Sequence, residues 1–165
     1  MSNLLQDRTA HIQKITGFLT EIGIHWREGK VPETTFVPGI GIENGCIVFD
    51  TESMLYPGDL LHEAGHIAVT TSGERPMLNG DVLNAAPNKD GDEMAVLLWS
   101  WLAAQQCGIP SRILFHEHGY KGDGDWLAEQ YDSGTYIAAP LLQWMGIIAK
   151  IEKGEKPRVI RWLRD

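Results

Sequence analysis

Two histidines and one glutamate near the middle of the chain follow the pattern His-Glu-x-x-His, and they are His62, Glu63 and His66. Residues four apart in a helix lie on one face about one turn apart, so both imidazoles can bind the same ion. Imidazole nitrogen is a common zinc ligand, and a tetrahedral site accepts such a pair. Glu63 projects about 100° around the helix from His62, where it can take a proton from metal-bound water. The pattern predicts a zinc site with His62 and His66 as ligands and Glu63 as general base.

The residues around this motif are mostly apolar from Asp59 to Val69, and the stretch 70–73 that follows is Thr-Thr-Ser-Gly. Such a sequence predicts a buried helix that ends at about residue 70. Gly65 lies inside it and costs about 1 kcal/mol relative to alanine, which indicates that another element packs closely there. The alternative is a partly buried helix whose histidines only form hydrogen bonds.

A hydrolytic zinc site needs a third protein ligand, and Glu93 is the best candidate. It opens an apolar run, residues 94–104, in which Ser100 is the only polar residue. A helix that is apolar almost all round is buried, and it could bring Glu93 to the histidines. The neighbouring Asp92 is better explained by free N–H groups at the helix start. Other possible ligands are Glu74, Asp81, Asp90, Asp92, His116 and His118.

A glycine-rich loop, residues 116–124, carries side chains that could stabilise the negative charge on a substrate carbonyl during hydrolysis. We predict His118 and Tyr120 as catalytic residues of this kind, with His116 and Tyr56 as further candidates. The alternative is a surface connection with incidental polar residues.

The elements that must position these residues begin with an amphipathic helix over residues 4–22. Strand patterns then follow at 24–26, 35–37, 40–42 and 46–49, and Asn44-Gly45 predicts a tight hairpin turn. We expect a small antiparallel sheet packed on the metal helix, in an α+β fold. Residues 74–89 are predicted as a loop with a short strand. Short helices are expected at 111–115, 126–131 (capped by Asp125) and 140–145, and a strand or helical turn at 158–163.

The composition is that of one globular domain over residues 1–165, because 43% of the residues are hydrophobic and 22% are charged. A net charge of −8 argues against binding to nucleic acid or to an anionic membrane. Cys46 and Cys107 are too few for a disulfide framework and predict reduced core residues. There is no signal-peptide pattern and no apolar run of membrane length, so we expect a cytoplasmic protein.

The region from Ile40 to about Pro110 resembles the ImmA/IrrE-like metallopeptidases. The resemblance is carried by the strand at 46–49, by His-Glu-x-Gly-His, and by a glutamate that opens an alanine-bearing helix. It implies a compact zincin-like domain with His62, His66 and Glu93 as zinc ligands and Glu63 as catalytic base. It also implies a protein substrate such as a repressor, and repressors tend to be basic.

The expected function is therefore zinc-dependent hydrolysis of peptide bonds in an intracellular protein. One alternative is a non-catalytic zinc-binding regulatory or interaction protein, in which a fourth ligand such as His116 or His118 closes the site. The other is a protein without metal.

Overall fold

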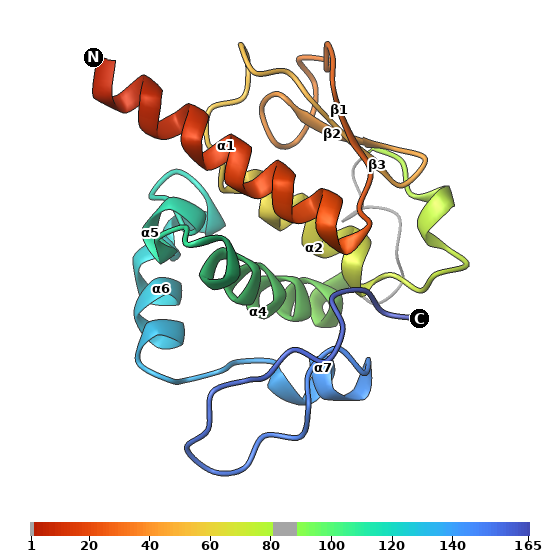
Figure 1. Ribbon diagram of the computed structural model, residues 1–165, viewed down its shortest axis with the longest axis vertical. Coiled ribbons are helices and arrows are strands. Elements are labelled where there is room, and N and C mark those ends of the chain that lie inside the picture. Colours follow the sequence, from red (N-terminus) through yellow and green to blue (C-terminus); the bar gives the residue numbers. More distant parts are fainter. Residues whose placement is uncertain (1, 81–88) are drawn as a thin grey trace.

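The computed structural model describes residues 2–80 and 89–165 (Figure 1). A long helix, a small sheet and two packed central helices make up most of it, which confirms the α+β class. The helices are α1 (Ser2–Ile22), α2 (Asp59–Val69), α4 (Lys89–Cys107), α5 (Ser111–Leu114), α6 (Gly124–Asp132) and α7 (Ala139–Trp144), with 3-10 helices η1 (Arg75–Met77) and η2 (Tyr120–Gly122).

The sheet has three strands, β1 (Trp26–Glu28), β2 (Ile40–Glu43) and β3 (Cys46–Phe49), in the order β1-β3-β2. Strands β2 and β3 form the predicted antiparallel hairpin. Its turn residues Asn44 and Gly45 have φ angles of 49° and 74°, as a type I′ turn requires.

Two predictions about the sheet are wrong. Strand β1 pairs with β3 in parallel, not antiparallel, because residues 29–39 carry the chain to the far side of β3 before β2 begins. The expected strand at 35–37 is instead part of this connection, a run of turns and bends between Pro32 and Pro38. Neither proline can donate a backbone hydrogen bond to a neighbouring strand.

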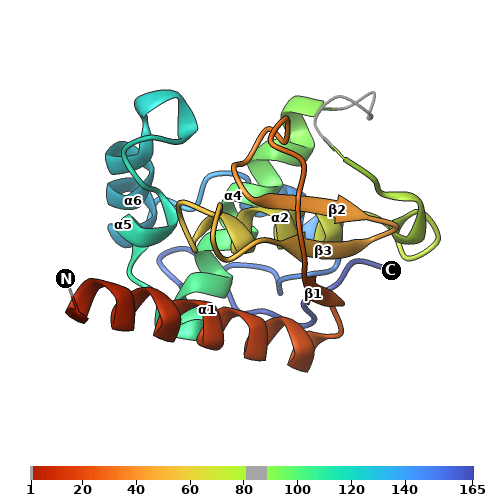
Figure 2. The same ribbon diagram turned by 90° about the horizontal axis from the view of Figure 1, so that it is seen from above.

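Helix α2 lies at the centre, packed against the sheet on one side and α4 on the other, while α1 crosses both helices (Figures 1 and 2). Every residue of α2 except Glu63 is buried. Apolar residues such as Leu60 and Leu61 meet Ile47 and Phe49 of β3 in one continuous core. The His-Glu-x-x-His motif therefore lies on a helix that is otherwise completely buried, and only Glu63 is partly exposed.

The last turn of α2 has no unpaired carbonyl, although it ends inside the protein. Its four carbonyls are, in order, those of His66, Ile67, Ala68 and Val69. Thr70 donates its hydroxyl to the first of these carbonyls at 2.7 Å, and Arg75 donates Nε to the second at 3.2 Å. Arg164 satisfies the other two with its backbone N–H at 2.9 Å and its Nη1 at 3.3 Å. A buried helix end needs such partners, since water does not reach it.

We expect Arg75→Ala to lower the free energy of unfolding by about 1–3 kcal/mol, because it leaves a buried carbonyl without its donor. Arg112→Ala is the matched control, since its ion pair with Asp125 is exposed and should contribute less than about 1 kcal/mol. Urea denaturation of both variants measures the difference. Equal losses in the two variants would show that the carbonyl contacts of Arg75 do not stabilise the helix end.

The later helices lie close to their predicted positions, but Asp125 is not a cap. It stands in the first turn of α6 and pairs with Arg112, and the capping residue is Asp123, without a side-chain hydrogen bond. Near the C-terminus, Val159 forms a single bridge with Ile148, and residues 160–165 are irregular. Within the predicted loop 74–89, the described residues 74–80 contain η1 and no strand, and Lys89 already begins α4, while residues 81–88 lie outside those described.

Both cysteines are free and partly buried. Burial raises the pKa of the Cys107 thiol to about 11 and also raises that of Cys46, so both stay protonated at neutral pH. In the part of the chain that the structure covers, none of the helices combines the length and the apolar character needed to cross a membrane.

Candidate metal centre

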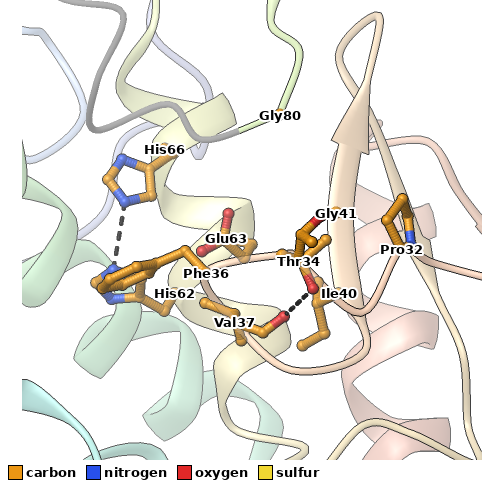
Figure 3. A pocket seen from close by; sticks show the side chains of 11 residues that line it. Pro32, Thr34, Phe36, Val37, Ile40, Gly41, His62, Glu63, His66 and Gly80 are labelled. Atoms are coloured by element: carbon orange, nitrogen blue, oxygen red, sulfur yellow. Dashed lines mark hydrogen bonds between the residues drawn. The ribbon is translucent and has the colours of Figure 1, made fainter.

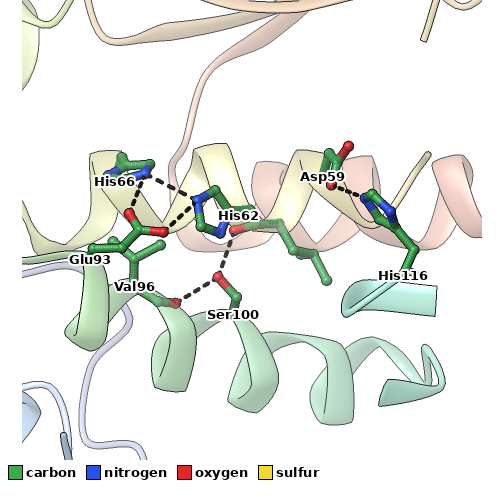
Figure 4. A network of polar contacts seen from close by, with 8 residues as sticks. Asp59, His62, His66, Glu93, Val96, Ser100 and His116 are labelled. Atoms are coloured by element: carbon green, nitrogen blue, oxygen red, sulfur yellow. Dashed lines mark hydrogen bonds and ion pairs between the residues drawn. The ribbon is translucent and has the colours of Figure 1, made fainter. Parts of the chain in front are cut away.

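Three donor groups meet between α2 and α4. The Nε2 atoms of His62 and His66 are 3.3 Å apart. Glu93 reaches across from α4 and places Oε1 3.2 Å from His62 Nε2 and Oε2 3.3 Å from His66 Nε2 (Figure 4). The structure thus brings together the three residues that the sequence suggested as ligands.

The spacing of these donors fits a tetrahedral ion. The edge of a tetrahedron is about 1.6 times its centre-to-corner distance, so zinc bonds of about 2.0–2.1 Å need donors about 3.3–3.4 Å apart. The three observed separations are 3.3, 3.2 and 3.3 Å. Two imidazoles and a carboxylate therefore suit zinc in number, chemistry and separation.

Glu63 belongs to the same cluster, because one of its oxygens lies within 4.8 Å of the ligand nitrogens of His62 and His66. This group could hold a metal ion by itself, so two carboxylates compete for the third position. Glu93 contacts both histidines directly, while Glu63 stands on the wall of a pocket. The direct contact favours Glu93 as ligand and leaves Glu63 beside the ion.

The Glu93 carboxylate is charged at neutral pH. Its burial would raise its pKa, but hydrogen bonds with His62 and His66 outweigh that effect and hold the pKa well below its usual range. A partly buried anion between two imidazoles attracts a cation.

Close packing of α2 on α4 makes this contact possible. A Cβ atom at Gly65 would lie 2.8 Å from Val96 Cγ1 and 3.1 Å from Ser100 Oγ. The Ser100 hydroxyl donates to the carbonyl of Val96 at 2.7 Å and lies 3.3 Å from that of Leu61, so it contacts both helices and does not line the pocket. The close approach expected at Gly65 is confirmed.

We expect Gly65→Ala to separate the helices, lowering the free energy of unfolding by about 1–3 kcal/mol and zinc affinity by at least about threefold. Gly17→Ala in α1 is the control, since nothing lies within 4 Å of its added methyl. That variant should gain about 0.5–1 kcal/mol from helix propensity and bind zinc normally. Thermal melts and zinc titrations of both variants give the two quantities. A Gly65→Ala protein as stable as the parent would contradict the packing argument.

His118 is not brought to this site. Its side chain is 64% exposed and pairs with Glu117 at 3.2 Å. Among the other possible ligands, Glu74 is exposed and accepts a hydrogen bond from Thr71. Asp81 and the side chain of Asp90 lie outside the described residues.

Tyr120 lies directly against a predicted ligand. Its ring packs edge-on at 5.5 Å from that of His62. The hydroxyl of Tyr120 and Nδ1 of His62 are both buried without a hydrogen-bond partner among the described residues. Burial, and then the nearby charges of Asp59, Glu93 and Glu63, raise the pKa of Tyr120 well above its usual value. Tyr120 is therefore protonated at neutral pH and packs its ring against His62, but it does not line the pocket.

Asp59 and His116 form a pair that the sequence did not suggest. His116 Nε2 lies 2.8 Å from Asp59 Oδ1, and the ring of Tyr56 stacks on His116 with centroids 3.7 Å apart. This pair joins the first turn of α2 to the loop that carries Tyr120. Tyr120 itself has a φ of 55°, in the left-handed region that non-glycine residues seldom adopt. We infer that the His116 anchor helps hold Tyr120 in place.

A pocket of about 400 Å³ opens beside the candidate ligands (Figure 3). His62, Glu63 and His66 form the side that belongs to α2. The connection before β2, the start of β2 and Gly80 form the other side. Glu63 therefore faces a space that can hold a molecule.

Comparisons with protein-family models, with curated proteins and with solved structures found no match to this chain.

Proposed function

We propose that this protein is a zinc-dependent metallopeptidase that hydrolyses peptide bonds of another protein. His62, His66 and Glu93 hold the ion, and Glu63 is the general base. The observation that carries the proposal is the arrangement of three donors at tetrahedral spacing beside a pocket, with Glu63 on the pocket wall.

Zinc held by these three residues would supply a water of lowered pKa and would polarise a substrate carbonyl. Glu63 has the placement of a base, because it is the one residue of α2 that is not buried and it lines the pocket. It accepts a proton from the attacking water and returns it to the leaving nitrogen. The ring of Tyr120 packs edge-on against the imidazole of His62 and limits its movement.

An open fourth position favours hydrolysis over a structural role for zinc. The residues that could have closed the site are engaged elsewhere, since His116 bonds Asp59 and His118 pairs with Glu117. Within the described ranges, no further histidine or cysteine joins the cluster. Among the described residues, Glu63 alone could close the fourth position as a non-catalytic zinc site would need, and its place on the pocket wall favours the role of base instead.

An extended peptide is the substrate that best suits the surroundings. Strand β2 is at the edge of the sheet, and its first residues, Ile40 and Gly41, line the pocket. Edge strands bind extended peptides through backbone hydrogen bonds. Further along β2, Ile42 already accepts a hydrogen bond from Gly80 at 2.8 Å, which limits the available edge to the end beside the histidines. A net charge of −8 favours a basic protein, as a DNA-binding repressor would be.

Cleavage of unstructured peptides tests the proposal. A mixture of synthetic peptides is incubated with the zinc-loaded protein, with the chelated protein and with the chelated protein after zinc is restored, and products are identified by mass spectrometry. We expect new termini in the first and third samples only. If a zinc-loaded protein leaves every peptide intact, a non-catalytic zinc-binding function replaces this one.

We expect the purified protein to take up about one zinc per chain at neutral pH and to release it on acidification, since only neutral imidazole binds metal. Apparent affinity should therefore fall steadily as pH is lowered. Competition with a chromogenic chelator over a pH series measures it. An affinity that does not change with pH would be inconsistent with two histidine ligands.

A further inference from the structure

The wall of the pocket that faces the metal ligands is uncharged. Its described residues are Pro32, Thr34, Thr35, Phe36, Val37 and Ile40, followed by two glycines. Opposite them, Glu63 is the only carboxylate among the described lining residues. One side of the pocket therefore offers polar and charged groups, and the other offers mainly apolar contact.

Phe36 is the most prominent residue of this wall. Its side chain is 73% exposed, although it is a large aromatic group. Single exposed apolar residues are common, but Phe36 continues into Val37 and the buried Ile40 along the same wall. In Figure 3 its ring overlaps His62 in projection, and both residues line the pocket. The ring would be covered by a molecule that enters the pocket.

The loop that carries Phe36 is held in place by its own contacts. Thr35 donates its hydroxyl to the carbonyl of Val37 at 2.8 Å, and the same carbonyl accepts from the N–H of Ile40 at 3.2 Å. The methyl groups of Val31 and Thr35 lie 3.6 and 3.9 Å from where a Cβ of Gly41 would stand, so the loop packs on β2. Phe36 is thus presented from a fixed turn.

We propose that this wall is a specificity subsite for one bulky apolar side chain of the substrate, of the leucine or phenylalanine type, next to the bond that is cut. The subsite rests on the proposed peptidase function and adds the class of residue that it selects. A volume of about 400 Å³ is near the lower end for small-ligand sites, so it suits one or two residues of a peptide. A charged substrate side chain would lose water here without gaining a partner from the wall.

Hydroxamic acids test the subsite without any cleavage assay, because the hydroxamate group binds zinc and an attached arm probes the wall. Three probes are titrated into the zinc-loaded protein by calorimetry: acetohydroxamic acid, 3-phenylpropionohydroxamic acid, and a compound of similar length with a terminal amide. We expect the phenyl arm to tighten binding at least about tenfold, the gain that burial of about two methylene groups supplies. The amide arm should give little gain.

Phe36→Ala should reduce the advantage of the phenyl arm to about threefold or less while acetohydroxamic acid binds as before. The matched control is Leu4→Ala, an apolar residue of α1 that is 76% exposed and does not line the pocket. It should leave all affinities unchanged. If the phenyl arm adds no affinity, or if its gain is the same in Phe36→Ala, the proposed subsite is wrong. Either result would leave the proposed metal site unaffected. If acetohydroxamic acid does not bind the zinc-loaded protein at all, the open coordination position is absent, and the peptidase function fails together with the subsite.

Discussion

Replacing Glu63 with glutamine is expected to leave zinc binding intact and to lower peptide hydrolysis by about 100-fold to 10,000-fold, the range over which a general base contributes. The amide keeps the size of the side chain but cannot accept a proton from water at neutral pH. Zinc should be retained because Glu93, not Glu63, is in direct contact with both histidines. Single-turnover cleavage of a peptide found in the assay above and a zinc titration measure the two properties on the same preparation.

Glu117→Gln is the matched control for this experiment. It makes the same chemical change at a side chain that is 83% exposed and pairs with His118. Activity there should stay within about twofold of the parent, as expected for a surface substitution. Hydrolysis that persists in Glu63→Gln would remove Glu63 from the mechanism. Loss of zinc in that variant would instead identify Glu63 as the third ligand.

Removing the carboxylate of Glu93 should have the largest effect on the metal. Glu93→Ala is expected to weaken zinc binding at least tenfold, a loss of more than about 1.4 kcal/mol. The carboxylate is held charged by hydrogen bonds with His62 and His66, and the mutation leaves the ion with two protein ligands on one helix. Competitive titration against a fluorescent zinc chelator gives the affinity.

Asp92→Ala is the control for Glu93, since the two residues are adjacent in α4 but point about 100° apart. It should keep its zinc affinity and lose at most about 1 kcal/mol of stability from the helix dipole, because α4 begins at Lys89 and Asp92 is its fourth residue, not the predicted cap. A reversed result, in which Asp92→Ala loses the metal and Glu93→Ala keeps it, would mean that the contacts of Glu93 with the histidines are only an ion pair.

Local patterns predicted the helix α2 and the hairpin of β2 and β3 correctly. The spacing of His62 and His66 depends only on the helical repeat, and the turn at Asn44-Gly45 depends only on backbone angles that these residues favour. The place of Glu93 beside the histidines could also be predicted, because the apolar run after it required a helix that is buried against another one. The helix and the hairpin are determined by residues that are close together in the sequence.

Features that depend on distant residues were missed. Arg164 satisfies the end of α2 from 95 positions away, and His116 pairs with Asp59 across 57 positions. The parallel pairing of β1 depends on the route of the whole connection before β2. Phe36 lies in a run of β-branched and aromatic residues that favours a strand, yet the flanking prolines and the packing on Gly41 make it a loop. No local pattern indicated its place beside the metal ligands.

We propose that His62, His66 and Glu93 hold one zinc ion with an open fourth position. X-ray absorption at the zinc edge, on protein without a histidine tag and loaded with one equivalent of zinc, tests it most directly. We expect a first shell of nitrogen and oxygen at about 2.0–2.1 Å, with the multiple-scattering signal of two imidazoles and no sulfur at about 2.3 Å. The Glu93→Ala variant should lose one oxygen from that shell. A protein that retains no zinc, or a spectrum with four protein ligands or with sulfur, would rule out this three-ligand site.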